Sequence, residues 1–428
     1  MVSKILGNFG VRFLSAIFNL LIAILVSRYI GAAGKGEQSI VLAMVAIITI
    51  FDNMVGGASI VYLASRIARK NLFIASYLWT ILVSVLAYIV LLIVPFIHEK
   101  YILSVVVLSG ISSLVSIHSS ILLGKEQLKQ FNLLSFLVPG LTLLTLFILF
   151  YFNWNRTPEA YVFSLFIAYG STLLTSFFLV RKEWRSSEHI STSSIISSFK
   201  SLLFYGFQNQ LAHVFQLLSF RISYFFLERY CGDAEVGIYS NAVSVIESVW
   251  MISTSISLWQ YARIANSTDT TYTKRMTEQL TKYGLLTAFL ALIILLVIPD
   301  AFFTWLFGKE FHQLNQLMLV LAPGIWVFNY ALILGHYFSG HGRYWVNAVA
   351  SGFGLVVTVV AAYYYIPIYR IYGAAMAASL SYLVTSFVVI VYFYRDGGKF
   401  VVFPSVQDLN ESWSLLKSFL SKRQINHE

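Results

Sequence analysis

The stretch Leu72–Ile97, LFIASYLWTILVSVLAYIVLLIVPFI, contains no charged side chain. An α-helix needs about 20 consecutive apolar residues to cross the hydrocarbon core of a bilayer. The whole chain has the same character, because 58% of its 428 residues are hydrophobic and 11% are charged. Soluble domains carry about 25% charged residues. The stretch is therefore predicted to span a membrane, and the composition predicts that it is one span among many.

Twelve segments have the length and hydropathy of a membrane span. They are 5–30, 38–64, 72–97, 101–123, 128–152, 158–180, 200–228, 236–262, 280–305, 312–337, 344–366 and 372–394. Glycine, proline or charged residues separate them, as at Gly124–Lys129. The sequence therefore predicts an all-α polytopic membrane protein with about twelve transmembrane helices.

Lysine and arginine are unequally divided between the two sides of these predicted helices. The N-terminal side carries 20 of the 29 Lys and Arg residues, the opposite side carries 7, and Arg12 and Arg221 lie inside helices. Short cytoplasmic loops are rich in Lys and Arg. Both termini are therefore predicted in the cytoplasm, and the net charge of +10 is assigned to topology rather than to nucleic-acid binding.

The two halves of the chain repeat each other at an offset of 201 residues. RYIGAAGKGEQS (Arg28–Ser39) aligns with RYCGDAEVGIYS (Arg229–Ser240), and six of the twelve positions are identical. Both copies follow the first helix of a half, so the repeat is parallel and its axis runs along the membrane normal. We predict two pseudo-symmetric six-helix lobes, 1–180 and 200–396, joined by a cytoplasmic linker, 181–199, and followed by an amphipathic cytoplasmic tail, 397–428.

The two Gly-containing turns, with the length and the twelve predicted helices, resemble the Wzx-type polysaccharide and O-antigen flippases of the multidrug/oligosaccharidyl-lipid/polysaccharide exporter superfamily. The resemblance implies two lobes around a central cavity that move an undecaprenyl-pyrophosphate-linked oligosaccharide unit, for O-antigen (lipopolysaccharide) or capsule, by alternating access. It also implies the bacterial inner membrane as the location. Membrane lipids, a polysaccharide polymerase and a chain-length regulator would be its partners.

Few ionisable residues fall inside the predicted helices, and each is costly there unless it faces a cavity or a partner. They are Arg12, Asp52, His118, His213, Arg221, Glu247 and His336. Arginine binds phosphate oxygens through a planar fork of donors. Arg12 and Arg221 are therefore predicted to contact a pyrophosphate headgroup, with His213 as an accessory. The alternative is that each arginine extends to the nearer membrane surface.

Polar side chains accompany these charges. In helix 200–228, Asn209, His213 and Gln216 follow one another at spacings of four and three residues, and so lie on one helix face. That face either lines the cavity or packs against another helix. Asn8, Asn53, Gln260 and Asn329 complete the predicted substrate-binding set.

The acids Asp52 and Glu247 have two open interpretations: counter-ion to an arginine, or carrier of a coupled proton or sodium ion. His336 is grouped with them for ion coupling. His118 and His336 are each alone on an apolar helix, where a hydrogen-bonded packing role is favoured over ion coupling.

Several functions are disfavoured. The chain has no G-x-x-x-x-G-K-[ST] loop for ATP and no close His/Cys ligand set, so no cofactor and no metal are predicted. The predicted outside loops are short, which disfavours an enzyme such as a glycan polymerase or ligase. A drug/cation antiporter of the same superfamily remains the alternative, although its cavity would need an excess of acids.

Overall fold

The computed structural model describes residues 2–64, 67–184 and 192–405. Within these residues the chain is helical and contains no strand. The elements are α1 (Val2–Asp52), the 3-10 helix η1 (Asn53–Val55), α2 (Gly57–Leu63), α3 (Arg69–Ile93), α4 (Glu99–Gly124), α5 (Leu128–Tyr151), α6 (Pro158–Trp184), α7 (Thr192–Cys231), α8 (Asp233–Glu247), α9 (Trp250–Ala265), α10 (Thr270–Val297), α11 (Asp300–Phe307), α12 (Leu314–Gly340) and α13 (Tyr344–Arg395). The predicted amphipathic tail helix lies almost entirely outside the described residues.

The predicted spans map onto these helices. Eight described helices are long and apolar enough to cross a membrane, and α8 with α9, which are bent by 49° relative to each other, counts as a ninth if the pair is one span. Helices α1 and α13 are 51 and 52 residues long, and each contains two predicted spans separated by a break. Together with α7, this arrangement matches about twelve crossings. The chain is a multi-pass, all-α membrane protein.

Three predicted bounds differ from the structure. Span 280–305 is two helices, because α10 ends at Val297 and α11 begins at Asp300 after Pro299, whose ring cannot continue a helix. Span 38–64 is interrupted by η1. Helix α7 begins at Thr192, inside the predicted linker. This early turn forms because Ile195, Phe199 and Leu202 bury their side chains against a cluster from α2, α3 and α4.

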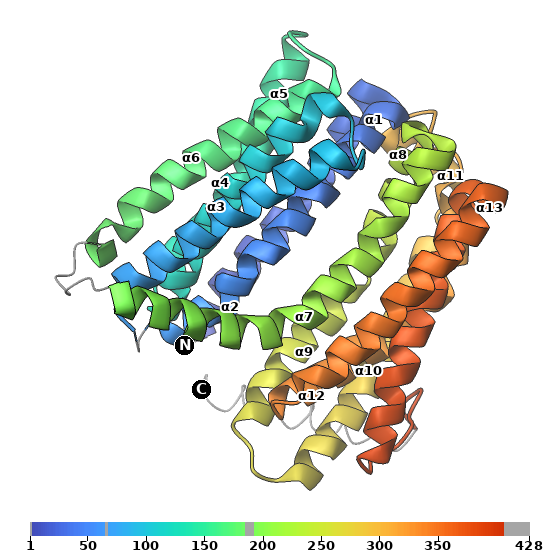
Figure 1. Cartoon of the computed structure of the whole chain (residues 1–428). Coiled ribbons are helices and arrows are strands. Elements are labelled where there is room, and N and C mark those ends of the chain that lie inside the picture. Colours follow the sequence, from blue (N-terminus) through green and yellow to red (C-terminus); the bar gives the residue numbers. More distant parts are fainter. Residues whose placement is uncertain (1, 65–66, 185–191, 406–428) are drawn as a thin grey trace, which may run out of the picture.

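The two halves of the chain form two groups of helices, α1–α6 and α7–α13, which we call the N-lobe and the C-lobe. Figure 1 shows the lobes meeting where α1 lies beside α8 and diverging away from that contact. The first part of α7 crosses from the N-lobe to the C-lobe at the diverging end, and it contacts α2, α3 and η1. We call the end where α1 meets α8 the joined end.

Equivalent glycines break the chain in each lobe at the joined end. Gly31 has φ 81° and ψ −175°, and Gly232, which lies 201 residues later, has φ 85° and ψ 171°. These left-handed values are available to glycine at little cost. The sequence repeat therefore encodes the same backbone break twice.

The same offset relates the contacts between the lobes. A Cβ on Gly36 would lie 1.9 Å from the carbonyl oxygen of Asp233, and a Cβ on Gly237 would lie 1.9 Å from that of Ala32. The hydroxyls of Ser39 and Ser240, also 201 residues apart, share a hydrogen bond of 2.8 Å. A pseudo-twofold axis thus passes between these two serines, and the repeated glycines allow α1 and α8 to touch backbone to backbone.

Candidate functional site

The predicted headgroup residue Arg221 lies on α7, inside the C-lobe, among polar partners from two neighbouring helices. Its Nη2 lies 3.7 Å from Glu247 Oε2 of α8, and its Nη1 donates to the Tyr224 hydroxyl at 3.1 Å. The Tyr382 hydroxyl of α13 donates to the other Glu247 oxygen at 3.4 Å. Both charged side chains keep some exposure, 26% for Arg221 and 17% for Glu247. The structure therefore brings together a predicted headgroup residue and a predicted counter-ion.

Lys35 of the N-lobe faces this group, and sequence reasoning missed it. The side chain is buried, its Nζ donates to Gln38 Oε1 at 2.8 Å, and it is close enough to Arg221 for electrostatic repulsion. Two cations thus accompany one acid where the lobes meet. The repeat contained a signal for Lys35, because the equivalent position in the second copy is Val236, which leaves the charge in one copy only.

Two predicted histidines come together in the C-lobe. His213 on α7 and His336 on α12 interact electrostatically, and His336 Nδ1 hydrogen-bonds to the carbonyl of Leu332 at 2.8 Å. The ring of Tyr261 lies with its centroid 6.3 Å from that of His336. His213 is exposed, whereas His336 is half-buried. The two histidines lie on α7 and α12, whereas the residues of other helices that contact Arg221 lie on α8 and α13.

The polar residues of the N-lobe form a separate group along α4. Asp52 is buried and accepts a hydrogen bond from Ser113. Within the described part of the chain, its other oxygen has no hydrogen-bond partner. Asn53 Oδ1 accepts from Ser116 at 3.0 Å. Among the described side chains, Glu247 has an arginine as its ion-pair partner, whereas Asp52 forms no ion pair with an arginine.

His118 has the packing environment that its isolation on an apolar helix suggested. Its Nε2 lies 2.5 Å from the Tyr77 hydroxyl and its Nδ1 lies 2.6 Å from Ser176 Oγ. Both ring nitrogens are therefore used within the N-lobe.

Two amides of the predicted substrate-binding set lie inside the C-lobe. Gln260 and Asn329 are both 0% exposed. Gln260 Nε2 donates to Thr277 at 2.8 Å, and Asn329 Oδ1 accepts from Ser253 at 2.5 Å. In this conformation neither amide is accessible to a sugar, because each joins neighbouring helices of its own lobe. Hydrophobicity cannot reveal this, since a buried amide and a cavity-lining amide look alike in sequence.

The remaining predicted residues are placed only by their helices. Arg12 and Asn8 lie on α1 and Asn209 lies on α7, and their side chains are outside the described part of the structure. Gln216 is half-buried on α7. Their roles remain predictions.

The fold is that of transporters with two helical lobes. The structure of the lipid II flippase MurJ in an inward closed conformation aligns with 97% of this chain and 92% of MurJ, with a TM-score of 0.74 and 14% identity. An inward-facing multidrug resistance transporter of the MATE family, within the MOP superfamily, aligns with 89% of this chain and 94% of its own, with a TM-score of 0.67 and 14% identity. These likenesses establish the fold.

The sequence establishes the family. Residues 1–259 match the family described as "Polysaccharide biosynthesis protein", and the chain belongs to that family. The capsular polysaccharide biosynthesis protein CapF of Staphylococcus aureus is 25% identical over 172 residues. That match covers 40% of this chain and 43% of CapF, so the chain spans less than half the length of this curated relative.

Proposed function

We propose that this protein is a flippase for lipid-linked polysaccharide units, carrying undecaprenyl-pyrophosphate-linked oligosaccharides from the cytoplasmic to the periplasmic leaflet of a bacterial inner membrane. The observation that carries the proposal is the match of residues 1–259 to the polysaccharide biosynthesis family in a chain that folds as a two-lobe transporter. The cargo is a surface polysaccharide unit, either capsule or O-antigen. A polysaccharide polymerase and a chain-length regulator are the proposed partners.

The orientation follows from the charge distribution of the loops. With both termini in the cytoplasm, the joined end faces the periplasm and the lobes diverge towards the cytoplasm (Figure 1). The described conformation is then the one that receives cargo. Release on the other side requires α1 and α8 to separate.

The electrostatics between the lobes favours an anionic group. Lys35 and Arg221 together outnumber Glu247, so this group of charges carries a net positive charge. An antiporter for organic cations would need acids in excess at this place. The MATE-like fold by itself fits both functions, and the local excess of positive charge favours the flippase.

Deletion of the gene tests the proposal. Surface polysaccharide should disappear and lipid-linked repeat units should accumulate in the cytoplasmic leaflet, because the glycan is assembled there and cannot cross. Both are measured by immunoblotting of surface glycan and by mass spectrometry of extracted lipid-linked intermediates. Complementation with the wild-type gene is the control. Normal surface polysaccharide in the deletion strain, or cation-coupled drug efflux by the reconstituted protein without any effect on glycans, would reject the proposal.

A further inference from the structure

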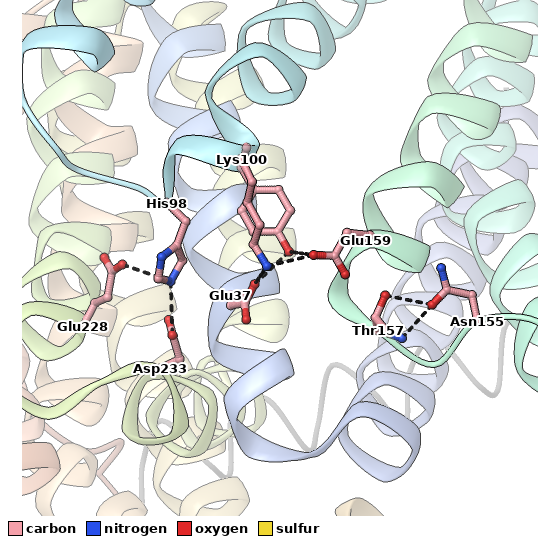
Figure 2. Close-up of polar contacts among 9 residues, drawn as sticks. Glu37, His98, Lys100, Asn155, Thr157, Glu159, Glu228 and Asp233 are labelled. Atoms are coloured by element: carbon pink, nitrogen blue, oxygen red, sulfur yellow. Dashed lines mark hydrogen bonds and ion pairs between the residues drawn. The ribbon is translucent and has the colours of Figure 1, made fainter.

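Three metal-ligating side chains from the two lobes converge at the joined end. Figure 2 shows His98 pointing between Glu228 and Asp233. His98 Nε2 lies 3.2 Å from Asp233 Oδ2 and 3.7 Å from Glu228 Oε1. The three ligand atoms all lie within 4.8 Å of one another. No other group of three or more His, Cys, Asp and Glu residues with this geometry occurs in the described ranges.

The local backbone explains why these residues meet. Glu228 belongs to the last turn of α7 and Asp233 begins α8, and the left-handed Gly232 between them turns both carboxylates to one side. His98 immediately precedes α4 and belongs to the N-lobe. The cluster is therefore formed only when the lobes are in contact.

The pseudo-twofold axis relates the contact at Asp233 to an equivalent contact at Ala32, which is a simple hydrogen bond. Ala32 occupies the position equivalent to Asp233, and its backbone N–H donates to the carboxylate of Glu310, which follows α11 in the C-lobe. One side of the axis thus carries an amide–carboxylate hydrogen bond. The other side carries an imidazole and two carboxylates, which are the usual ligands of a divalent metal ion.

The charge of the cluster favours a cation. Glu228 and Asp233 repel each other, and Glu37 adds to the repulsion on Glu228. Lys100, which Figure 2 also shows, is held by Glu37 at 2.9 Å and Glu159 at 2.8 Å. One buried oxygen of Asp233 has no hydrogen-bond partner within the described residues. Among the described residues, His98 is the one basic side chain in an ion pair with these two carboxylates, so the cluster contains more acidic than basic groups.

We propose that His98, Glu228 and Asp233 form a binding site for a divalent transition-metal ion, best fitted by Zn²⁺, which joins the N-lobe to the C-lobe. Zinc binds His nitrogen and carboxylate oxygen at about 2.0–2.2 Å with tetrahedral geometry, which places neighbouring ligand atoms about 3.4 Å apart. The distances from His98 Nε2 to Asp233 Oδ2 and Glu228 Oε1, 3.2 and 3.7 Å, lie on either side of this value. Water would fill the fourth position, because the exposed His98 gives access to solvent.

The site has a consequence for the transport cycle. Two ligands belong to one lobe and the third to the other, so the ion stabilises the state in which the lobes touch. Bound metal would oppose separation of α1 and α8, and so hold the protein in the cargo-receiving conformation. This gating role rests on the proposed function, whereas metal binding itself does not.

Zinc binding to the purified, full-length protein tests the proposal without any cargo. The protein carries an affinity tag free of histidine, and bound Zn²⁺ is measured by equilibrium dialysis and elemental mass spectrometry. One zinc ion per chain is expected for the wild type. His98→Ala and Asp233→Asn should each weaken binding by at least about tenfold, because losing even an outer partner of a metal ligand costs about 10–100-fold.

The matched control is His312→Ala. His312 is also exposed and lies between α11 and α12, with its Nε2 3.2 Å from the side-chain nitrogen of Gln313. This variant should bind zinc as the wild type does. Zinc should raise the melting temperature of the wild type and of His312→Ala, and should have no effect on His98→Ala, because only a bridging ion stabilises the contact between lobes.

Two results would overturn the site. One is wild-type zinc affinity in both His98→Ala and Asp233→Asn, and the other is the absence of stoichiometric zinc from the wild type. Folding of each variant is checked by size-exclusion chromatography. Glu228→Gln is a third variant, which removes the charge of a ligand with almost no change in side-chain shape. Failure here leaves the flippase proposal intact, since that proposal is tested by glycan export.

Discussion

Arg221 is the residue on which the interpretation of the central charges depends. Its pairing with Glu247 and its hydrogen bond to Tyr224 fit two roles. Either Arg221 only neutralises an acid inside the C-lobe, or it uses its remaining donors for an anionic headgroup. A guanidinium has five N–H donors, and the contacts with Tyr224 and Glu247 occupy only part of them. The two roles make different predictions for a paired substitution.

Arg221→Ala should abolish most surface polysaccharide while the protein remains in the membrane, because a cation that attracts pyrophosphate is removed. Arg221→Lys should restore part of the export, since charge is kept while the planar fork is lost. Export is measured by surface-glycan immunoblotting and protein level by membrane immunoblotting. Arg263→Ala is the matched control, because Arg263 is exposed just before the end of α9 and should export normally.

The double variant Arg221→Ala/Glu247→Gln separates headgroup binding from neutralisation. Removing one partner of a buried ion pair leaves the other charge uncompensated, and removing both relieves this cost. If Arg221 binds the headgroup, the double variant should fold as well as wild type and still fail to export. Recovery of export in the double variant would show that Arg221 is only a counter-ion.

At the scale of the element, the crossing of α1 and α8 is the feature that the repeat specifies. Helices this close need residues without side chains at the crossing, and small residues recur at such contacts in membranes. Gly36 and Gly237 fill these positions, each against a backbone carbonyl of the other lobe. The break at Gly31 and Gly232 then sends the following helix back towards the other side of the membrane.

Gly36→Ala should lower the melting temperature of the purified protein, because the added methyl group would lie 1.9 Å from the Asp233 carbonyl oxygen. Overpacking of this kind costs about 1–3 kcal/mol. Gly170→Ala is the control, since Gly170 lies within α6 with nothing within 4 Å of an added Cβ. Alanine favours a helix more than glycine does, so that variant should be as stable as wild type or more stable. A Gly36→Ala protein with wild-type stability would contradict the close crossing.

At the scale of the whole molecule, alternating access requires the joined end to open. The lobes are held there by Ser39 and Ser240 on the pseudo-twofold axis and by Asn241 Nδ2, which donates to Ser27 Oγ at 2.7 Å. Arg28 adds a hydrogen bond to the carbonyl of Leu306 at 3.0 Å. These polar contacts adjoin one apolar cluster that contains buried side chains of both lobes, such as Val41 of α1 and Val243 of α8, so opening of this end exposes apolar surface as well.

A covalent link at the axis should stop transport. Ser39→Cys/Ser240→Cys, in a Cys231→Ser background, places two thiols where hydroxyls are 2.8 Å apart, which is compatible with a disulfide. Oxidation should block export in the double variant and reduction should restore it, whereas either single variant should export under both conditions. Normal export with the crosslink confirmed by mass spectrometry would show that the joined end does not open during the cycle.

The sequence determined the membrane-spanning helices well, because the bilayer alone sets their length and their hydrogen bonding. The twelve apolar segments follow from the thickness of the bilayer, and helical structure follows because backbone groups must be satisfied internally in lipid. The match between Arg28–Ser39 and Arg229–Ser240 identified the two equivalent breaks and thereby the two-lobe plan. The break at Pro299 has a local cause in the proline ring, whereas the interruption at η1 depends on packing and was not predicted.

The candidate site shows the other limit of sequence reasoning. Patterns on one helix predicted that Arg221, Glu247 and the histidines face protein rather than lipid, because charge is costly in hydrocarbon. Which residues meet across helices depends on how α7, α8 and α13 pack, and no spacing along one helix contains that information. Hence only the tertiary structure paired Arg221 with Glu247 and placed Lys35 beside them. It also buried Gln260 and Asn329 in the interior of the C-lobe. Finally, it brought His98 of the N-lobe to Glu228 and Asp233 of the C-lobe.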